Sequence, residues 1–191
     1  MVINMRVLIL AGDMVEALEI FYPYFRLKEE GFEVHVAAPT KKVLQTVVHD
    51  REPNYETYTE KLGYRFIWVD KSFSEVNPEE YDGVIIPGGR APEYIRNYND
   101  VERILRHFVE SGKPIGALCH GLLVLNAFGF LKGKKVTSTI AAKMDLIVGG
   151  AHWVDEEVVV DGNLVTSRTW RDLHAFMRTF IKMLRTRGKE S

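Results

Sequence analysis

The segment GALCHGLLVLNAFG, residues 116–129, holds Cys119, the only cysteine in the 191 residues of the chain. The short apolar run Ile115–Leu118 in front of it predicts a buried strand, and the apolar residues behind it predict a helix. A strand that turns sharply into a helix at a cysteine, between Gly116 and Gly121, is typical of a nucleophile elbow at the carboxyl edge of a parallel sheet. The free N–H groups at the start of that helix are expected to lower the pKa of the thiol.

The same cysteine also fits a second interpretation, a small side chain of the core, because free cysteines are among the most buried residues. His120 and Gly121, which follow it directly, favour the elbow. With one cysteine the chain cannot form an internal disulfide framework or a CxxC metal site, and this indicates a reducing compartment.

Outward from this segment, apolar runs of strand length alternate with segments of helical period, which predicts an α/β fold with a mostly parallel sheet. The expected strands are Met5–Ala11, Phe32–Ala38, Gly83–Pro87, Ile115–Leu118, Val136–Ser138, Val158–Val160 and Leu164–Ser167. The expected helices are Val15–Glu30, a segment from an N-cap at Asp100 to Gly112, one after Cys119, and Arg171–Leu184. The dipeptide Asp161-Gly162 predicts a hairpin between the last two strands. We expect a single domain over residues 1–191.

The segment Thr40–Phe73 is longer and more polar than the other connections. It is interpreted as an excursion that lies over the site, with two strands around Thr46–His49 and Tyr64–Val69. The pair His49-Asp50 within it could reach the cleft, but a position at the surface is favoured. We expect the three tryptophans to lie in the core or at an interface; these are Trp68, Trp153 and Trp170.

Composition excludes several classes of function. The 25 basic and 26 acidic residues are mixed along the chain and give a formal net charge of −1, so no basic surface for nucleic acid is indicated. The N-terminal apolar run is shorter than the ~18 residues that a membrane span needs, and we expect a cytoplasmic protein without a membrane partner. The histidines lack a metal-ligand spacing, and AGDMVE is not a nucleotide-binding GxGxxG loop, so neither a metal nor a cofactor is expected.

A second motif, PGGRAPEY at residues 87–94, follows an expected strand. Gly88 and Gly89 let the backbone turn its amides toward a cleft, where the N–H of Gly89 pairs with the N–H of His120 as an oxyanion hole. An ordinary Pro-Gly turn with Arg90 and Glu93 in solvent is the other interpretation of this motif.

A third motif, GDMVEALEIFYP at residues 12–23, begins the first expected helix. Glu16 and Glu19 are three residues apart and share a face near the end of this helix that lies at the carboxyl edge of the sheet. A carboxyl group beside the thiol is expected to stay protonated by burial, and to hydrogen bond the thiolate or carry a proton. An exposed acidic face of the helix is the alternative.

These motifs together with VVVDGNLVTSR resemble the PfpI family of the class I glutamine amidotransferase-like superfamily, from about Arg6 to Leu184. That family includes the parkinsonism-associated protein deglycase and intracellular protease I, and the excursion is similar to the branch of glutathione-independent glyoxalases. The resemblance implies a flavodoxin-like three-layer α/β/α sandwich and a dimer or larger homo-oligomer. It also implies that Cys119 is the reactive cysteine and that Glu19, with Glu16 as a close second, is the carboxyl group that contacts it.

The resemblance further implies that His120 and Glu93 match a histidine and a glutamate of the protease-like members, where the glutamate comes from a neighbouring subunit. Gly89 and His120 match the amides of the oxyanion hole. The chain departs from the family pattern at Leu122, at Thr139-Ile140 and in SRTWRD, residues 167–172, where pocket walls are expected.

Three functions follow from these motifs. The leading hypothesis is an enzyme without cofactor that converts a small carbonyl substrate, such as methylglyoxal or its early adducts, through Cys119 with proton transfer by Glu19 and His120. The alternatives are an oligomeric cysteine peptidase that uses Cys119, His120 and Glu93, and a redox sensor or chaperone. A glutamine amidotransferase is disfavoured because the candidate segment DLHAF has no glutamate two residues after His174, where the triad needs His-x-Glu.

Overall fold

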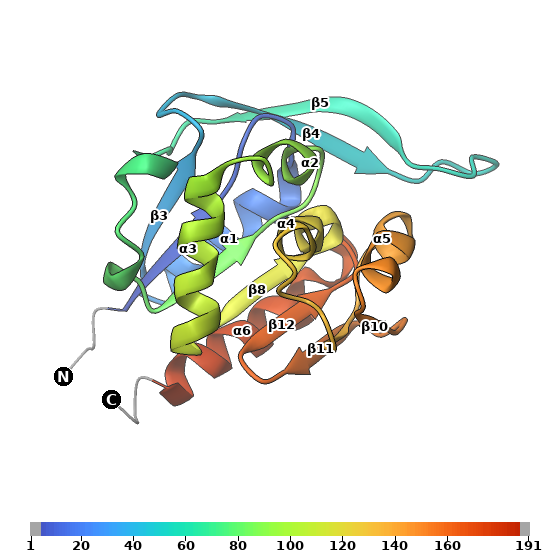
Figure 1. Cartoon of the computed structure of the whole chain (residues 1–191). Helices are drawn as coiled ribbons and strands as arrows, with labels where there is room; N and C mark the ends of the chain where they lie inside the picture. Colours follow the sequence, from blue (N-terminus) through green and yellow to red (C-terminus); the bar gives the residue numbers. More distant parts are fainter. Residues whose placement is uncertain (1–4, 188–191) are drawn as a thin grey trace.

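A seven-stranded sheet forms the centre of the computed structural model, which describes residues 5–187, and its strand order is β11-β12-β8-β7-β1-β3-β6 (Figure 1). The strands are β1 (Arg6–Leu10), β3 (Glu33–Ala38), β6 (Lys71–Ser72), β7 (Gly83–Ile86), β8 (Ile115–Leu118), β11 (Val158–Asp161) and β12 (Leu164–Ser167). All neighbouring strands are parallel except β11 and β12, which form the predicted hairpin at Asp161-Gly162. The predicted α/β fold with a mostly parallel sheet is confirmed.

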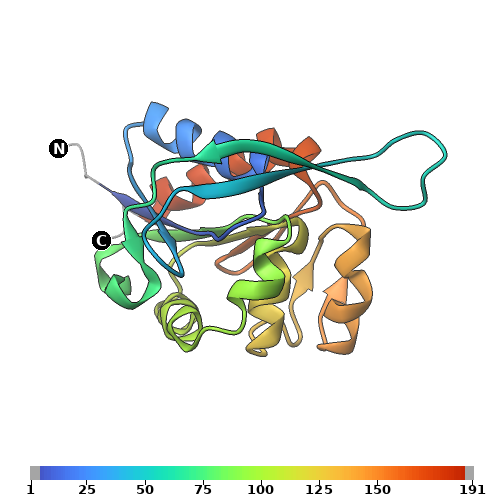
Figure 2. The same cartoon turned by 90° about the horizontal axis from the view of Figure 1, so that it is seen from above.

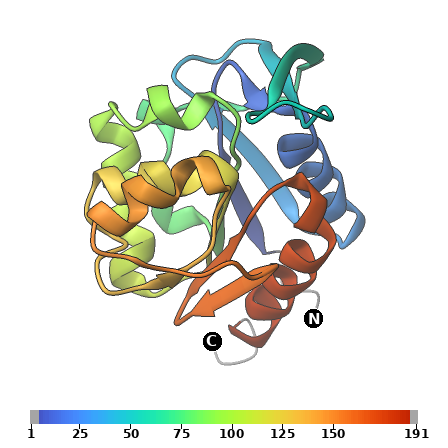
Figure 3. The ribbon, with the colours of Figure 1, turned by 90° about the vertical axis from the view of Figure 1, so that its right-hand side faces the viewer.

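Helices cover both faces of this sheet (Figure 2). One face carries α1 (Ala17–Glu29) and α6 (Leu173–Arg187), and the other carries α2 (Ala91–Ile95), α3 (Asn99–Ser111), α4 (Leu122–Ala127) and α5 (Lys143–Val148). Side chains of β1 alternate between two apolar clusters, with Val7 and Ile9 toward α1 and α6, and Leu8 and Leu10 toward α3. Burial of both faces explains why the strands are apolar throughout. This is the three-layer, flavodoxin-like sandwich that the family resemblance implies, and Figure 3 shows it from the side.

Two helix starts differ from the sequence prediction. Helix α3 begins at Asn99 with Tyr98 as its N-cap, because the carboxylate of Asp100 pairs with Arg103 at 3.1 Å instead of capping the helix. Its end agrees with the prediction, since Gly112 has a φ of +65°, which favours glycine. Helix α1 begins at Ala17 because the two residues before it form a short strand.

The excursion forms a second sheet of three strands, β2 (Val15–Glu16), β4 (Leu44–Asp50) and β5 (Thr59–Phe66). Strands β4 and β5 are antiparallel and make a long hairpin that projects beyond the sandwich (Figures 1 and 2). The first strand of the excursion is confirmed, but the second lies earlier than the predicted Tyr64–Val69. Its position follows from pairing with β4, from Leu44 opposite Phe66 to Asp50 opposite Thr59.

The strand predicted at Val136–Ser138 is also displaced. Strand β9 (Lys135–Val136) pairs with β10 (His152–Trp153) in a separate small sheet. The next amide, that of Thr137, donates to the side-chain oxygen of Thr166 at 3.1 Å, which ends the ladder.

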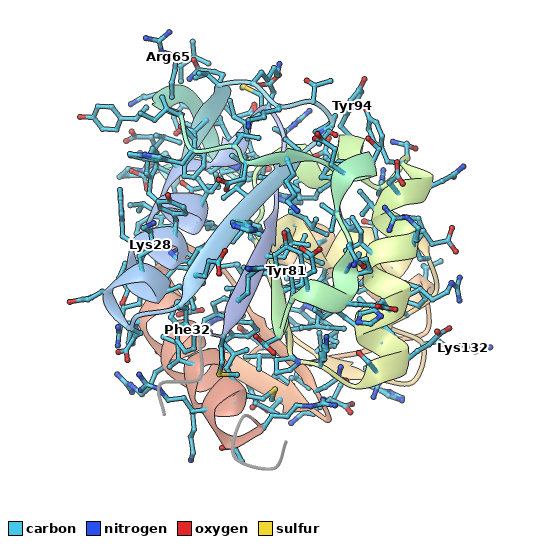
Figure 4. All side chains as sticks on the ribbon, turned by 90° about the vertical axis from the view of Figure 1, so that its left-hand side faces the viewer. Lys28, Phe32, Arg65, Tyr81, Tyr94 and Lys132 are labelled. Carbon is cyan, nitrogen blue, oxygen red and sulfur yellow. The ribbon has the colours of Figure 1, made fainter. Side chains whose placement is uncertain are left out.

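The β2-β4-β5 sheet and α2 lie near the carboxyl edge of the main sheet. In Figure 4 the labelled side chains of Arg65, on β5, and Tyr94, on α2, both lie at this upper end of the molecule. Tyr81, labelled in the middle of the same view, is fully buried, and its hydroxyl lies 2.9 Å from Nδ1 of His35. Within residues 5–187 no helix is long and apolar enough to cross a membrane.

Candidate active site

Cys119 lies directly after β8, at the start of a short 3₁₀ turn, Cys119–Gly121, that leads into α4. Its φ is +57°, in the left-handed region that side chains other than glycine rarely adopt, so the backbone is strained where the sulfur is presented. Gly121 is required for the turn, because a Cβ there would lie 2.2 Å from the carbonyl oxygen of Ile86 on β7. The predicted nucleophile elbow is confirmed.

Glu19 meets the thiol across Gly88. The Gly88 amide donates to Oε2 of Glu19 at 2.7 Å, and a Cβ on Gly88 would lie 2.5 Å from that oxygen and 2.9 Å from Sγ of Cys119. Only glycine at position 88 leaves room for the Glu19 carboxyl group on one side and the Cys119 sulfur on the other. The other oxygen of Glu19, Oε1, is buried without a hydrogen-bond partner among the described residues. The Gly88 amide therefore already donates its hydrogen bond to Glu19 and is not free to bind an oxyanion.

Glu16 is buried beside this pair but has a different contact. It is the N-cap of α1, and its Oε2 accepts the amide of Glu19 at 2.9 Å. Burial raises the pKa of Glu16 to about 7. Of the two glutamates that the sequence offers, Glu19 faces the sulfur and Glu16 orients the helix that carries Glu19.

The expected lowering of the Cys119 pKa is wrong. Burial raises the pKa of the thiol, and the charge of the Glu19 carboxylate raises it further, whereas the amides of Gly89 and His120 lower it. Burial also raises the pKa of Glu19, and the neighbouring Glu16 adds to the rise. Once Glu19 is protonated, its charge no longer opposes ionisation of the sulfur, so the two amides favour the thiolate against the opposing effect of burial.

His120 stands next to the sulfur without a carboxylate partner. Its Nδ1 lies 3.5 Å from Sγ of Cys119, and among residues 5–187 no ion pair or hydrogen bond joins its ring to an acid. Burial, together with the charges of His49 and Arg90, lowers the pKa of His120 to about 4. Glu93, predicted as its partner, lies on α2, where Arg90 contacts it at 3.4 Å, and it lines a different cavity. Within one chain the structure does not bring Glu93 to His120.

The hairpin supplies a residue for which the sequence favoured the wrong position. His49, predicted at the surface, is 6% exposed and lines the same cavity as Cys119. Its Nε2 lies 3.1 Å from Oε1 of Glu60, its ring packs on Tyr58 at 4.3 Å, and its carbonyl oxygen accepts Nε1–H of Trp170 at 2.9 Å. The sequence signal that could have placed His49 in the cavity is the alternation along β4, which puts His49 on the same buried face as Val47.

The cavity has a volume of about 480 Å³, enough for a small-molecule ligand. Its wall includes the segments Thr139-Ile140 and Arg168–Asp172, as predicted from the departures from the family pattern. Leu122, the third departure, is instead fully buried in the core. Trp153 and Trp170 line the cavity, contrary to the expectation of a core or interface position.

The charges around the cavity are of both signs. Arg168 holds Asp172 with Nε at 2.8 Å and Asp155 with Nη1 at 3.0 Å, which fixes this side of the wall. Among the described residues, no group of three or more His, Cys, Asp or Glu side chains is arranged to hold a metal ion.

Comparison with known proteins adds to this geometry. The sequence profile of the DJ-1/PfpI family matches residues 5–183. The chain is 44% identical over 181 residues to the protein named deglycase PfpI of Pyrococcus furiosus, a match that covers 95% of this chain and all of that protein. It is 36% identical over 180 residues to the putative cysteine protease YraA of Bacillus subtilis, covering 94% and 98% of the two chains. Among solved structures, a two-domain protein of Anabaena variabilis with DJ-1/ThiJ/PfpI-like and ferritin-like domains is similar, with a TM-score of 0.81 and 34% identity over 94% of this chain and 48% of that chain.

Proposed function

This chain belongs to the DJ-1/PfpI family, and from that premise we propose that it is a cysteine-dependent enzyme that acts on reactive dicarbonyl compounds and their early adducts with amines and thiols. The observation that carries the proposal is the convergence of the Cys119 sulfur, the Glu19 carboxyl group and the amides of Gly89 and His120 around one open cavity. The deglycase name of the 44% identical relative supports the same chemistry.

In the proposed reaction the Cys119 thiolate adds to the aldehyde carbon of the substrate. The amides of Gly89 and His120 stabilise the alkoxide that forms, and Glu19, kept protonated by burial, supplies the proton that turns it into a hemithioacetal. The hemithioacetal rearranges through an enediol into a thioester. Water then hydrolyses the thioester, which releases a 2-hydroxy acid and restores the thiol. With an adduct as substrate, the amine or thiol is the additional leaving group.

The size of the cavity supports early adducts as substrates. A volume of about 480 Å³ exceeds what a three-carbon dicarbonyl needs, and Trp153, Trp170 and Arg168 line it beyond the sulfur. Aromatic faces and a guanidinium group suit the amino-acid portion of a glycated amine.

A homo-oligomer is part of the same proposal. The outer face of α1 exposes Leu18 and Phe25, and the neighbouring strand β5 exposes Leu62 and Tyr64, whose exposed fractions are 72% and 84%. Exposed apolar side chains on two neighbouring elements favour a protein interface on this face.

The test compares wild type with Cys119→Ser on methylglyoxal, glyoxal, a glycated amine and a fluorogenic peptide. Loss of the sulfur nucleophile is expected to lower turnover of the carbonyl substrates by on the order of 10³-fold or more, measured as 2-hydroxy acid released. A matched thermal unfolding curve shows that the variant is folded. Undiminished turnover by Cys119→Ser would eliminate the proposed mechanism.

A cysteine peptidase is the second candidate, favoured by the Nδ1 of His120 at 3.5 Å from the sulfur and by the name of the YraA relative. It needs a carboxylate for His120, and Glu93 would have to come from a second copy of the chain. Peptide cleavage that appears only in the assembled fraction of a gel filtration run, and that Glu93→Gln abolishes, would favour this candidate over the carbonyl reaction.

A further inference from the structure

A second histidine reaches the cavity from the hairpin. His49 lies near the end of β4, is 6% exposed, and lines the cavity together with Cys119, Glu19 and His120. Its ring centroid is 6.4 Å from that of His120. The two histidines therefore face the same space from opposite elements, one from the elbow and one from the hairpin.

His49 has the carboxylate partner that His120 lacks. The register of the hairpin puts His49 directly opposite Glu60, and Nε2 of the ring lies 3.1 Å from Oε1 of the carboxylate. A carboxylate accepts hydrogen bonds and cannot donate one, so the contact assigns the ring proton to Nε2 and leaves a lone pair on Nδ1. Nδ1 is buried and has no partner within residues 5–187. A buried acceptor without a partner is costly unless a ligand satisfies it.

Neighbouring elements fix the position of this pair. Glu60 is also 3.5 Å from Nη1 of Arg90, which in turn contacts Glu93 at 3.4 Å. The carbonyl oxygen of His49 is held by the indole of Trp170. The titratable and charged groups that face the His49 ring are Glu60, Tyr58, His120, Arg90 and Glu93.

We propose that His49, oriented by Glu60, is the acid–base residue that carries a proton between the two carbonyl carbons of the substrate, a role that rests on the proposed function. In the hemithioacetal on Cys119, Nδ1 of His49 accepts the proton of the first carbon, the bonding pair forms a carbon–carbon double bond, and the π pair of the second carbonyl moves to its oxygen to give the enediolate. His49 then returns the proton to the second carbon while the hydroxyl group of the first carbon becomes the thioester carbonyl and its proton passes to the oxygen of the second carbon. The hemithioacetal and the thioester are isomers, so no oxidant or reductant is needed.

This assignment divides the proton transfers between two regions of the cavity. Glu19, which lies beside the sulfur, donates a proton to the oxygen of the first carbon. His49, on the hairpin side, moves the proton between the two carbon atoms. His120 then contributes its backbone amide, and its ring lies beside the sulfur, with its centroid 6.4 Å from that of His49.

The first test is His49→Gln, with Glu56→Gln as the control. Glutamine keeps an N–H that can donate to Glu60 but has no basic Nδ1, so the fold of the hairpin is retained. The expected result is a fall in kcat of about 10²- to 10⁴-fold with little change in KM, because positioned acid–base groups contribute at that scale. Alkylation of Cys119 by iodoacetamide is expected to proceed at the wild-type rate. Glu56 is exposed on the same hairpin and its substitution is expected to leave kcat unchanged.

The second test is the pH profile of kcat/KM for Glu60→Gln. The carboxylate of Glu60 raises the pKa of His49 against the opposite effect of burial, so its removal lowers that pKa. A base is active when deprotonated, and the acid limb of the profile is therefore expected to move to lower pH. If Glu60 had only a structural role, Glu60→Gln would lower kcat/KM by the same factor at every pH and would not move the acid limb.

The outcomes separate this inference from the proposed function. If Cys119→Ser is inactive but His49→Gln keeps the wild-type kcat, the role of His49 is overturned and the cysteine chemistry stands. If Cys119→Ser retains turnover, or if the wild type converts none of the carbonyl substrates, the proposed function fails and the role of His49 fails with it.

Discussion

Two regions enclose the cavity, and they are held in place by different forces. The elbow side is fixed by backbone approaches that only glycine permits, at Gly88 and Gly121, and by the strained φ of Cys119. On the hairpin side, the position of the His49 ring is fixed by side-chain contacts, chiefly its pair with Glu60. Backbone packing of the first kind tolerates almost no displacement, whereas a contact to a partly exposed carboxylate such as Glu60 adjusts at smaller cost. Substitutions that displace a supporting contact are therefore expected to have larger effects on the elbow side than on the hairpin side.

The largest effect that the comparison predicts concerns the pH dependence of stability at Glu16. Its folded pKa of about 7 lies above the ordinary 4.5, so its stabilisation is present below pH 4.5 and is lost as the pH rises through about 7. His120, lowered from 6.5 to about 4, acts in the opposite direction, since its stabilisation is present above pH 6.5 and is lost as the pH falls through about 4. The two slopes oppose each other between these values.

The variant Glu16→Gln removes the first slope and keeps an oxygen that can accept the amide of Glu19. Its free energy of unfolding is expected to rise relative to that of the wild type by roughly 3 kcal/mol from about pH 4 to about pH 8. Urea unfolding of both proteins at a series of pH values measures the difference. Parallel curves for the two proteins would mean that Glu16 is charged in the folded state at neutral pH.

The next effect concerns Gly88 and tests the elbow side directly. In Gly88→Ala the new Cβ would meet Oε2 of Glu19 and the Cβ of Cys119 at 2.5 and 2.6 Å, so one of the two must move. A displacement of about 1 Å at a reacting group is expected to lower kcat by on the order of 10²-fold. Gly133→Ala is the control, because it strains a positive φ but has no atom within 4 Å of its Cβ. Equal activity of both variants would show that the spacing of Glu19 and the sulfur does not limit the reaction.

The sequence predicted the elbow side well because its requirements are local. The fold, the family and the turn at Cys119 follow from a short apolar strand flanked by glycines, and all three are confirmed. The choice between Glu16 and Glu19 required the path of the backbone before α1. The raised pKa of Cys119 required the depth of burial, which no local pattern contains.

The hairpin side was predicted poorly for the same reason. His49 points inward because β4 pairs with β5 in a register set by residues ten or more positions away, and β5 itself begins at Thr59 rather than at Tyr64. The predictions of a single domain, a cytoplasmic location and the absence of a cofactor stay predictions.

The smallest effect tests how firmly the hairpin is held. Trp170→Phe keeps the aromatic wall of the cavity but removes the N–H that donates to the carbonyl oxygen of His49 at 2.9 Å. Loss of one hydrogen bond is expected to cost about 1 kcal/mol, which corresponds to about a fivefold fall in kcat/KM if the bond positions His49 for the reaction. Steady-state kinetics on a glycated amine, with thermal unfolding in parallel, separates this effect from a loss of stability. An effect as large as that of Gly88→Ala would contradict the comparison, because it would mean that the hairpin tolerates displacement no better than the elbow does.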